Sequence, residues 1–198
     1  MEKLLKNLKL RGFEPYYVEN SEEAKKLISE IIPAGSSIGF GGSVTVTETG
    51  LIPYLQEHGY VVYHRSLPEY TAEEIYSLNH TADWFCSSTN ALCESGDLVN
   101  IDGRANRVAE MLYGPKNILI VCGVNKIVKT IDEGINRTRN IASPKNCVKL
   151  GKKTPCAVTG KCMNCNSPDT ICKATVIQHH PTSGKRVCIV IINETLGF

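Results

Sequence analysis

The sequence predicts an α/β protein with a mostly parallel sheet flanked by helices. Short apolar runs alternate with amphipathic helical patterns along residues 15–141. The interval between successive runs is long enough for the helical crossover that parallel strands require. With 198 residues the chain has the length of one domain, so residues 1–198 are expected to form a single unit.

The elements are expected in a regular order. Leu4, Leu5 and Leu8 have helical spacing, and Asn20 and Ser21 stand where the cap of a second helix belongs. Short apolar runs bounded by turn residues predict strands at 15–18, 36–40, 60–64, 82–88, 97–101 and 117–124. Helical patterns predict helices at 3–11, 22–32, 47–59, 71–81, 103–113 and 126–141.

The chain changes character after Pro144. Residues 147–173 contain few large apolar side chains and no clear periodicity, so they are expected to form a cysteine-rich insertion. Two strand-like runs follow, at 174–180 and 186–192, and the sequence PTSGK between them has the composition of a turn. A C-terminal hairpin on the main sheet is therefore expected.

Composition limits the possible partners. The formal net charge of +2 gives no electrostatic reason to expect nucleic acid as a partner. No apolar stretch approaches the length of a membrane span, and the first residues do not have the pattern of a signal peptide. The expected protein is cytoplasmic.

Nine cysteines are the unusual feature of the composition, and an odd number cannot all pair in disulfides. Cys86, Cys122 and Cys188 lie in apolar runs and are expected in the core, as is Trp84. Cys93 and Cys147 have no assigned role.

The other four cysteines follow the spacing C-x5-C-x2-C-x6-C, and they are Cys156, Cys162, Cys165 and Cys172. A C-x2-C pair can direct two thiolates at one metal centre, and the flanking cysteines complete a four-ligand set. Structural zinc sites usually have two such pairs, whereas here there is one. An iron–sulfur cluster, of the [4Fe–4S] type, is therefore expected, with zinc as the alternative.

A glycine-rich turn provides a second candidate site. The run from Gly39 to Glu48 follows an apolar strand, and Gly41, Gly42, Ser43 and Thr45 are expected to contact an anionic ligand. The run matches neither a P-loop nor a dinucleotide fingerprint. A tight strand-to-helix turn without a ligand is the alternative.

A third candidate site lies between residues 89 and 107. Glu94 is placed where a carboxylate could face a cleft as a nucleophile or base. Asn106 and Arg107 stand at a helix start and suit a carboxylate or phosphate. The alternative is structural: Glu94 caps the backbone, and Arg107 pairs with Asp102 or Glu110.

Three stretches together resemble the LUD (lactate-utilisation) domain family: residues 39–50, 91–128 and the closing RVCIVIINETLGF. The resemblance implies a fold of the NagB/RpiA/CoA-transferase type. Some members carry a C-terminal cysteine segment, and the family is associated with iron–sulfur complexes that oxidise lactate to pyruvate. CoA transferases of similar fold use a glutamate nucleophile, and Glu94 stands in a comparable E-x-G setting.

These observations support three functional hypotheses. The first is an iron–sulfur accessory subunit that passes electrons among protein partners in a lactate-type oxidation system, since the chain lacks a flavin or nicotinamide fingerprint of its own. The second is an enzyme or binding protein for an anionic acyl, CoA or sugar-phosphate metabolite that uses Glu94. The third is a non-catalytic metabolite sensor stabilised by zinc.

Overall fold

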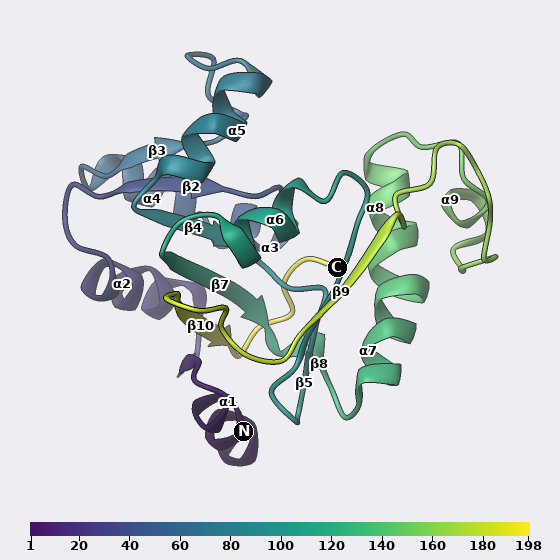
Figure 1. Ribbon diagram of the computed structural model, residues 1–198, viewed down its shortest axis with the longest axis horizontal. Helices are drawn as coiled ribbons and strands as arrows, with labels where there is room; N and C mark the ends of the chain where they lie inside the picture. The colour runs from purple at the N-terminus through teal and green to yellow at the C-terminus, as the bar shows by residue number, and fades with distance from the viewer.

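The computed structural model describes all 198 residues and confirms the α/β class (Figure 1). Its main sheet has six parallel strands, in the order β1-β10-β7-β4-β2-β3. The strands are β1 (Glu14–Val18), β10 (Arg186–Ile192), β7 (Asn117–Gly123), β4 (Trp84–Ser87), β2 (Ser37–Phe40) and β3 (Val61–Tyr63).

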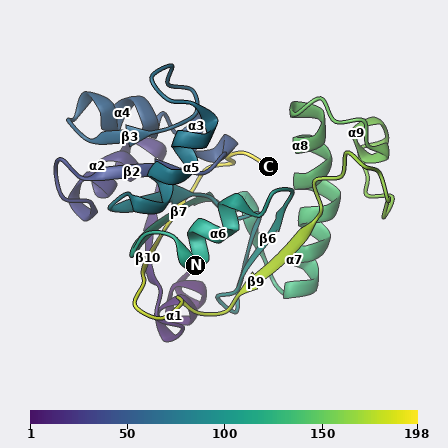
Figure 2. The ribbon, with the colours of Figure 1, turned by 45° about the horizontal axis from the view of Figure 1, so that its top comes forward.

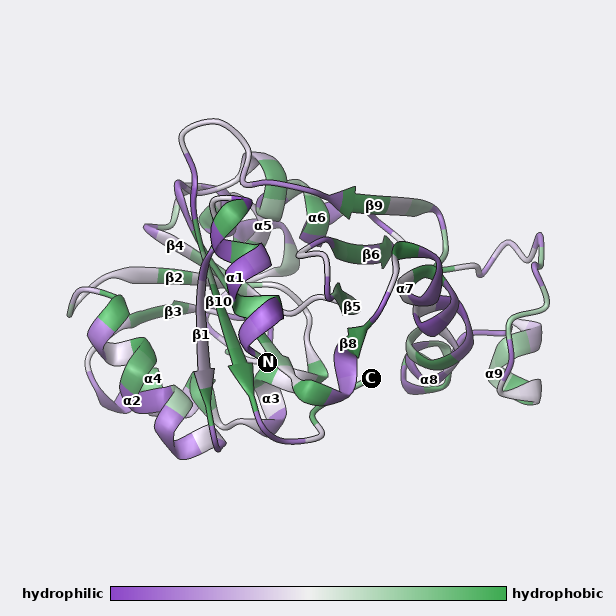
Figure 3. Ribbon diagram, turned by 90° about the horizontal axis from the view of Figure 1, so that it is seen from below, coloured by the Kyte–Doolittle hydropathy of each residue, from purple (hydrophilic) through white to green (hydrophobic).

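The central strands β7 and β10 are buried on both faces, which explains their continuous apolar sequences. Successive side chains alternate between two cores: Leu119 and Val121 of β7 point to one, and Ile118 and Ile120 to the other. Figure 3 shows the resulting hydrophobic colour along β10. Cys86, Cys122, Cys188 and Trp84 lie in these cores, as the sequence predicts.

Helices cover both faces of this sheet. Helices α2 (Ser21–Ile31), α3 (Val44–Glu48) and α4 (Leu51–Glu57) pack on the first core through residues such as Ile28 and Leu55. Helices α1 (Glu2–Leu10) and α6 (Asn106–Tyr113) pack on the second, and α5 (Ala72–Thr81) lies beside α6 over β2 and β3.

A second sheet of four strands lies on the second core, in the order β8-β5-β6-β9. Its strands are β8 (Ile127–Val128), β5 (Ala91–Cys93), β6 (Leu98–Asp102) and β9 (Ala174–Gln178). The expected C-terminal hairpin is therefore wrong, because β9 pairs with β6 while β10 lies between β1 and β7. The apolar run of β10 suits a strand buried on both faces, whereas β9 is only partly buried.

One long helical stretch covers the outer face of the second sheet (Figure 2). It consists of α7 (Ile131–Arg137), a π-helical turn η2 (Thr138–Ala142) and α8 (Ser143–Lys149). The prediction of a helix over 126–141 is wrong at both ends, since Ile127 and Val128 form β8. The helix also continues through Pro144, because the π-helical turn immediately before it changes the hydrogen-bond spacing where proline has no N–H.

A buried charge network ties α1 and β9 to the turn between β5 and β6. Asp97, with only 2% of its side chain exposed, accepts hydrogen bonds from Arg11 and Ser95 and contacts the ring of His179 at 2.6 Å. Burial alone would raise the pKa of Asp97, but the bonds from Ser95, His179 and Arg11 outweigh it and lower the pKa below its usual value.

This network predicts a specific acid sensitivity. A carboxylate with a depressed folded-state pKa contributes stability above about pH 4 and loses it as the pH falls further. Asp97→Asn is therefore expected to lower the free energy of unfolding by about 2 kcal/mol at pH 7. On acidification, the free energy of unfolding of this variant should fall by less than that of the wild type. Urea titrations at pH 7, 4 and 3 measure both effects. Glu22→Gln, which changes an exposed carboxylate that pairs with Lys25, is the control. If all three proteins lost the same free energy of unfolding on acidification, Asp97 would not be the source of the acid sensitivity.

Candidate functional site

A polar cleft lies at the carboxyl edge of the main sheet, where ligands commonly bind in open α/β folds. Its volume is about 590 Å³. The residues that follow β2, β4 and β7 form its base, and α8 and the cysteine segment form the opposite wall. A hollow along the exposed side of α1 has a similar volume, about 520 Å³, but only five residues line it.

Positive charge is concentrated in the cleft. Two acidic side chains line it, Asp102 and Asp169, whereas its basic lining residues are Arg65, Arg104, Arg107, Lys126, Lys149, Lys152 and Lys173. The whole chain has a net charge of only +2, so this excess is local. A concave surface with an excess of one sign of charge attracts ligands of the opposite sign. The cleft therefore favours an anion.

Lys126 lies at the base of the cleft and is 3% exposed. It ends the short 3-10 turn η1 (Val124–Lys126) that directly follows β7. Its Nζ donates hydrogen bonds to Thr45 Oγ1 at 2.6 Å and to Ser88 Oγ at 2.9 Å. No carboxylate oxygen lies within 4.0 Å of the amine, so the charge of Lys126 has no acidic partner.

The environment of Lys126 disfavours its charged form. Burial, the largest influence, together with the guanidinium groups of Arg137 and Arg107 lowers the pKa of Lys126 from 10.5 to about 8, although Glu48 acts in the opposite direction. A buried cation without a counter-ion destabilises the fold. Such a residue at the base of a cleft is a candidate for ligand contact.

The glycine-rich turn that follows β2 forms part of the lining of the cleft. Gly42, Ser43 and Thr45 line it, whereas Gly41 lies beneath, where a Cβ atom would stand 2.8 Å from Ser87 Oγ. The hydroxyl of Ser43 accepts a hydrogen bond from the backbone N–H of Val46 and so caps α3. The turn also lets Arg65, which forms no salt bridge, lie against the backbone of Gly42.

Arg107 and Asn106 also line the cleft, but the guanidinium of Arg107 is committed to the protein. Its Nη atoms donate to the carbonyls of Ser88 and Ile101 and to the side chains of Asn90 and Asn100, and its Nε lies 3.4 Å from Asp102 Oδ2. The structure thus favours the structural alternative for Arg107, in which it fixes β6 and the loop after β4.

Glu94 lies away from the cleft. It follows β5, its side chain is 40% exposed, and its carboxylate pairs with Lys3 of α1 at 3.3 Å. Its backbone carbonyl accepts a hydrogen bond from Asn7. The expected grouping of Glu94 with Gly42, Ser43 and Arg107 is therefore not present, and the structure gives Glu94 no place among the residues that line the cleft.

The four spaced cysteines all lie in the segment from α9 (Pro155–Thr159) to β9. Cys156 is buried, Cys162 and Cys165 are half-buried, and Cys172 is exposed. The structure brings no three cysteine, histidine or acidic side chains into a group that could hold a metal ion. The arrangement in this structure therefore does not itself fit a four-thiolate centre.

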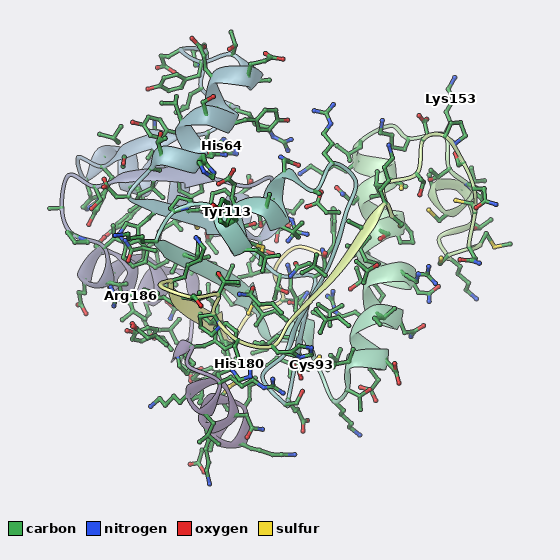
Figure 4. The ribbon with its side chains drawn as sticks, viewed as in Figure 1. His64, Cys93, Tyr113, Lys153, His180 and Arg186 are labelled. Carbon is green, nitrogen blue, oxygen red and sulfur yellow. The ribbon has the colours of Figure 1, made fainter.

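Cys147 and Cys93 occupy different surroundings. Cys147 of α8 is buried, and the thiols of Cys156 and Cys172 lie near it. Cys93 lies under α7, where its thiol is directed at the carbonyl of Thr130. Figure 4 shows Cys93 near one end of the long α7–α8 stretch, and Lys153 of the cysteine segment near the other end.

The cysteine segment is joined to the cleft. Three residues of the segment line the cleft: Pro168, Thr170 and Ile171. In addition, the backbone N–H of Lys173 donates a hydrogen bond to the carbonyl of Asp102. The Cα of Ile171 packs so closely on Gly103 that a Cβ there would stand 3.1 Å away. The cysteine segment therefore forms part of the cleft wall, and a rearrangement of the segment would alter the lining of the cleft.

Sequence patterns did not reveal Lys126, Arg65 or Ser88 as cleft residues. The available signal for Lys126 was a lysine immediately after the apolar run of β7, at the carboxyl end of a central strand.

None of the helices is both long and apolar enough to cross a membrane.

Comparisons with known proteins agree with this architecture. A DUF162 family protein from Deinococcus radiodurans has the same fold, with a TM-score of 0.54 and 15% identity over 96% of this chain and 94% of that chain. The eIF2B beta structure from Chaetomium thermophilum gives a TM-score of 0.39 and 11% identity over 57% of this chain and 44% of that chain, which is too weak to support an argument. No curated protein sequence matches.

The sequence model of the LUD domain matches residues 1–192. This match spans nearly the whole chain and confirms the resemblance seen in the three sequence stretches. The chain therefore belongs to the LUD domain family, which is associated with lactate utilisation.

Proposed function

We propose that this chain binds a small anionic metabolite of an organic-acid oxidation system in the cleft at the carboxyl edge of its main sheet. The observation that carries the proposal is Lys126, a buried cation without an acidic partner at the base of a basic cleft. An anionic ligand would supply the missing counter-charge and an acceptor for the third N–H of the ammonium group.

The size and lining of the cleft limit the ligand class. A volume of about 590 Å³ lies within the usual range for metabolite sites. The hydroxyls of Thr45 and Ser88 hold Lys126 in place, and Arg65 has no competing salt bridge. A small carboxylate of the 2-hydroxy or 2-oxo acid class suits these contacts and the association of the family with lactate utilisation.

Thermal denaturation with added ligands tests the proposal. Lactate, pyruvate and inorganic phosphate are added separately at pH 7, with glycerol as an uncharged control of similar size to the two carboxylates. Ligand that binds only the folded protein stabilises it, by about 2.7 kcal/mol at 100 times its Kd. A rise in Tm with at least one anion and none with glycerol is expected. The absence of any anion-dependent rise would contradict the proposal.

The titration of Lys126 predicts how binding depends on pH. Lys126 is charged below its pKa of about 8 and becomes neutral above it. Anion affinity is therefore expected to be constant between pH 6 and 7 and to fall about tenfold per pH unit above about 8. Calorimetric titrations from pH 6 to 9.5 measure the profile. An affinity that stays constant across this range would show that Lys126 does not supply the charge.

We propose a metal-binding role for the cysteine segment as a second function, supported by the spacing of the four cysteines and by the proximity of Cys156 to Cys147. Metal bonds would order a segment with few large apolar side chains. The thiols have to move together to share one centre, since no three of them form a metal-binding group in this structure.

Anaerobic purification tests this second function. Absorption near roughly 400 nm that bleaches with dithionite, with about four irons per chain, is expected for a four-thiolate cluster. Cys162→Ser should lose most of the iron, whereas Ser167→Ala, in the same segment, should retain it. A colourless protein with about one zinc per chain would instead identify a structural clamp, and a metal-free protein would exclude both.

A further inference from the structure

The hydrogen bonds around Lys126 leave its amine free to react. Thr45 Oγ1 donates to the carbonyl of Leu196, and Ser88 Oγ donates to the carbonyl of Thr89. Both hydroxyls therefore meet the amine with their oxygen atoms, as acceptors. A neutral amine has two N–H groups, and these two bonds use both of them. Its lone pair then has no partner within the protein.

The surroundings of Lys126 also supply a neutral fraction near neutral pH. The charged groups that act on it are the guanidinium groups of Arg137 and Arg107 on one side and the carboxylate of Glu48 on the other, and burial is the largest influence. The neighbouring Cys122 thiol is uncharged at neutral pH, because burial raises its pKa to about 11. A pKa of about 8 leaves roughly a tenth of the amine unprotonated at pH 7. Burial and neighbouring cations are the means by which proteins activate lysine as a nucleophile for carbonyl compounds.

The rest of the cleft selects which carbonyl compound can reach this amine. The basic lining, which includes Arg65 at the Gly42 turn and Lys149 of α8, favours a substrate with a negative charge. A 2-oxo acid carries a carboxylate directly beside its carbonyl carbon. It can therefore present the carbonyl to Lys126 while the basic lining holds the carboxylate.

We propose that Lys126 forms a reversible imine with a 2-oxo acid bound in the cleft, an inference that rests on the proposed anion-binding function. The lone pair of Nζ attacks the keto carbon, and an N–C bond forms as the carbonyl oxygen takes up a proton. The resulting carbinolamine loses its hydroxyl as water, and the remaining N–H proton is released or kept on the iminium nitrogen. The step consumes one amine and one carbonyl and produces one imine and one water, with no oxidant or reductant.

Reduction with borohydride makes the adduct permanent and tests the inference. The full-length protein is incubated with pyruvate at pH 8, treated with sodium borohydride and analysed by intact mass and peptide mapping. One addition of about 72 Da per chain, located on Lys126, is expected for the reduced imine. Lactate, which has the carboxylate but no carbonyl, should give no adduct, and acetone, which lacks the carboxylate, should label at least tenfold less.

Two lysine variants make the test specific. Lys126→Met should lose the adduct, whereas Lys129→Met, which removes an exposed lysine three residues away, should retain it. If pyruvate raises the Tm of the wild type and no adduct is trapped, the imine is excluded and anion binding stands. If labelling is spread over surface lysines and persists in Lys126→Met, the inference is also overturned. If no anion raises the Tm and nothing is trapped, both proposals fail.

Discussion

Replacing Arg107 by methionine is expected to lower the free energy of unfolding by about 3–5 kcal/mol, the largest stability effect that we predict at the cleft. The guanidinium holds Asn90, Asn100 and Asp102 in place through bonds that a methionine cannot make. Removing it would leave the Asp102 carboxylate, 10% exposed, without its cationic partner. Urea unfolding followed by circular dichroism measures the change.

A neighbouring arginine is the matched control for this prediction. Arg104 also lines the cleft, but its side chain bonds only to the hydroxyl of Tyr76, at an exposed position. Arg104→Met is therefore expected to change the free energy of unfolding by less than about 0.5 kcal/mol. If Arg107→Met is as stable as Arg104→Met but loses ligand binding, then Arg107 is a ligand contact and our structural assignment is wrong.

Replacing Lys126 by methionine is expected to weaken anion binding by about 100-fold without weakening the fold. The substitution removes the charge that faces the ligand and also removes a buried cation that has no acidic partner. The free energy of unfolding is therefore expected to stay constant or to rise by about 1 kcal/mol. Calorimetric titration with the best-stabilising anion and urea unfolding measure the two quantities on the same sample.

The exposed Lys129 controls for a general loss of positive charge. Lys129→Met is expected to bind the anion with wild-type affinity and to unfold at the same urea concentration. Lys126 would be a structural residue, rather than a ligand contact, if Lys126→Met lost more than about 2 kcal/mol of stability while its affinity stayed within twofold of the wild type.

The sequence predicts the main sheet well because its central strands have an unambiguous pattern. The runs at 117–124 and 186–192 are apolar at nearly every position, as strands buried on both faces must be. The same pattern correctly places Cys122 and Cys188 in the core. The second sheet was missed because β5 and β8 have only three and two residues, too few to show a period.

The candidate site was harder to predict because its key residue depends on an element boundary. Ile127, Val128, Ile131 and Ile135 fit a helical stripe, so the sequence predicts that Lys126 lies at the start of a helix. In the structure the first two belong to β8, and Lys126 instead occupies the turn at the carboxyl end of β7. Its hydroxyl partners Thr45 and Ser88 come from distant parts of the chain, and no local pattern could bring them together.

For Glu94, in contrast, the sequence predicts a site residue that the structure places outside the cleft. Its E-x-G setting suggests a nucleophile, but a local motif does not determine which side of a sheet edge a side chain faces. Pairing with Lys3 of α1 directs its carboxylate to the surface. The glycine-rich turn was located correctly, and its glycines serve close packing against Ser87 and Arg65.

A crystal structure of the protein with the most stabilising anion tests the central claim most directly. The account predicts ligand density in the cleft, with an anionic oxygen about 2.8 Å from Nζ of Lys126 and with Thr45 and Ser88 still bonded to that amine. Density in the hollow along α1, beside Glu2 and Lys6, with an empty cleft would contradict the account.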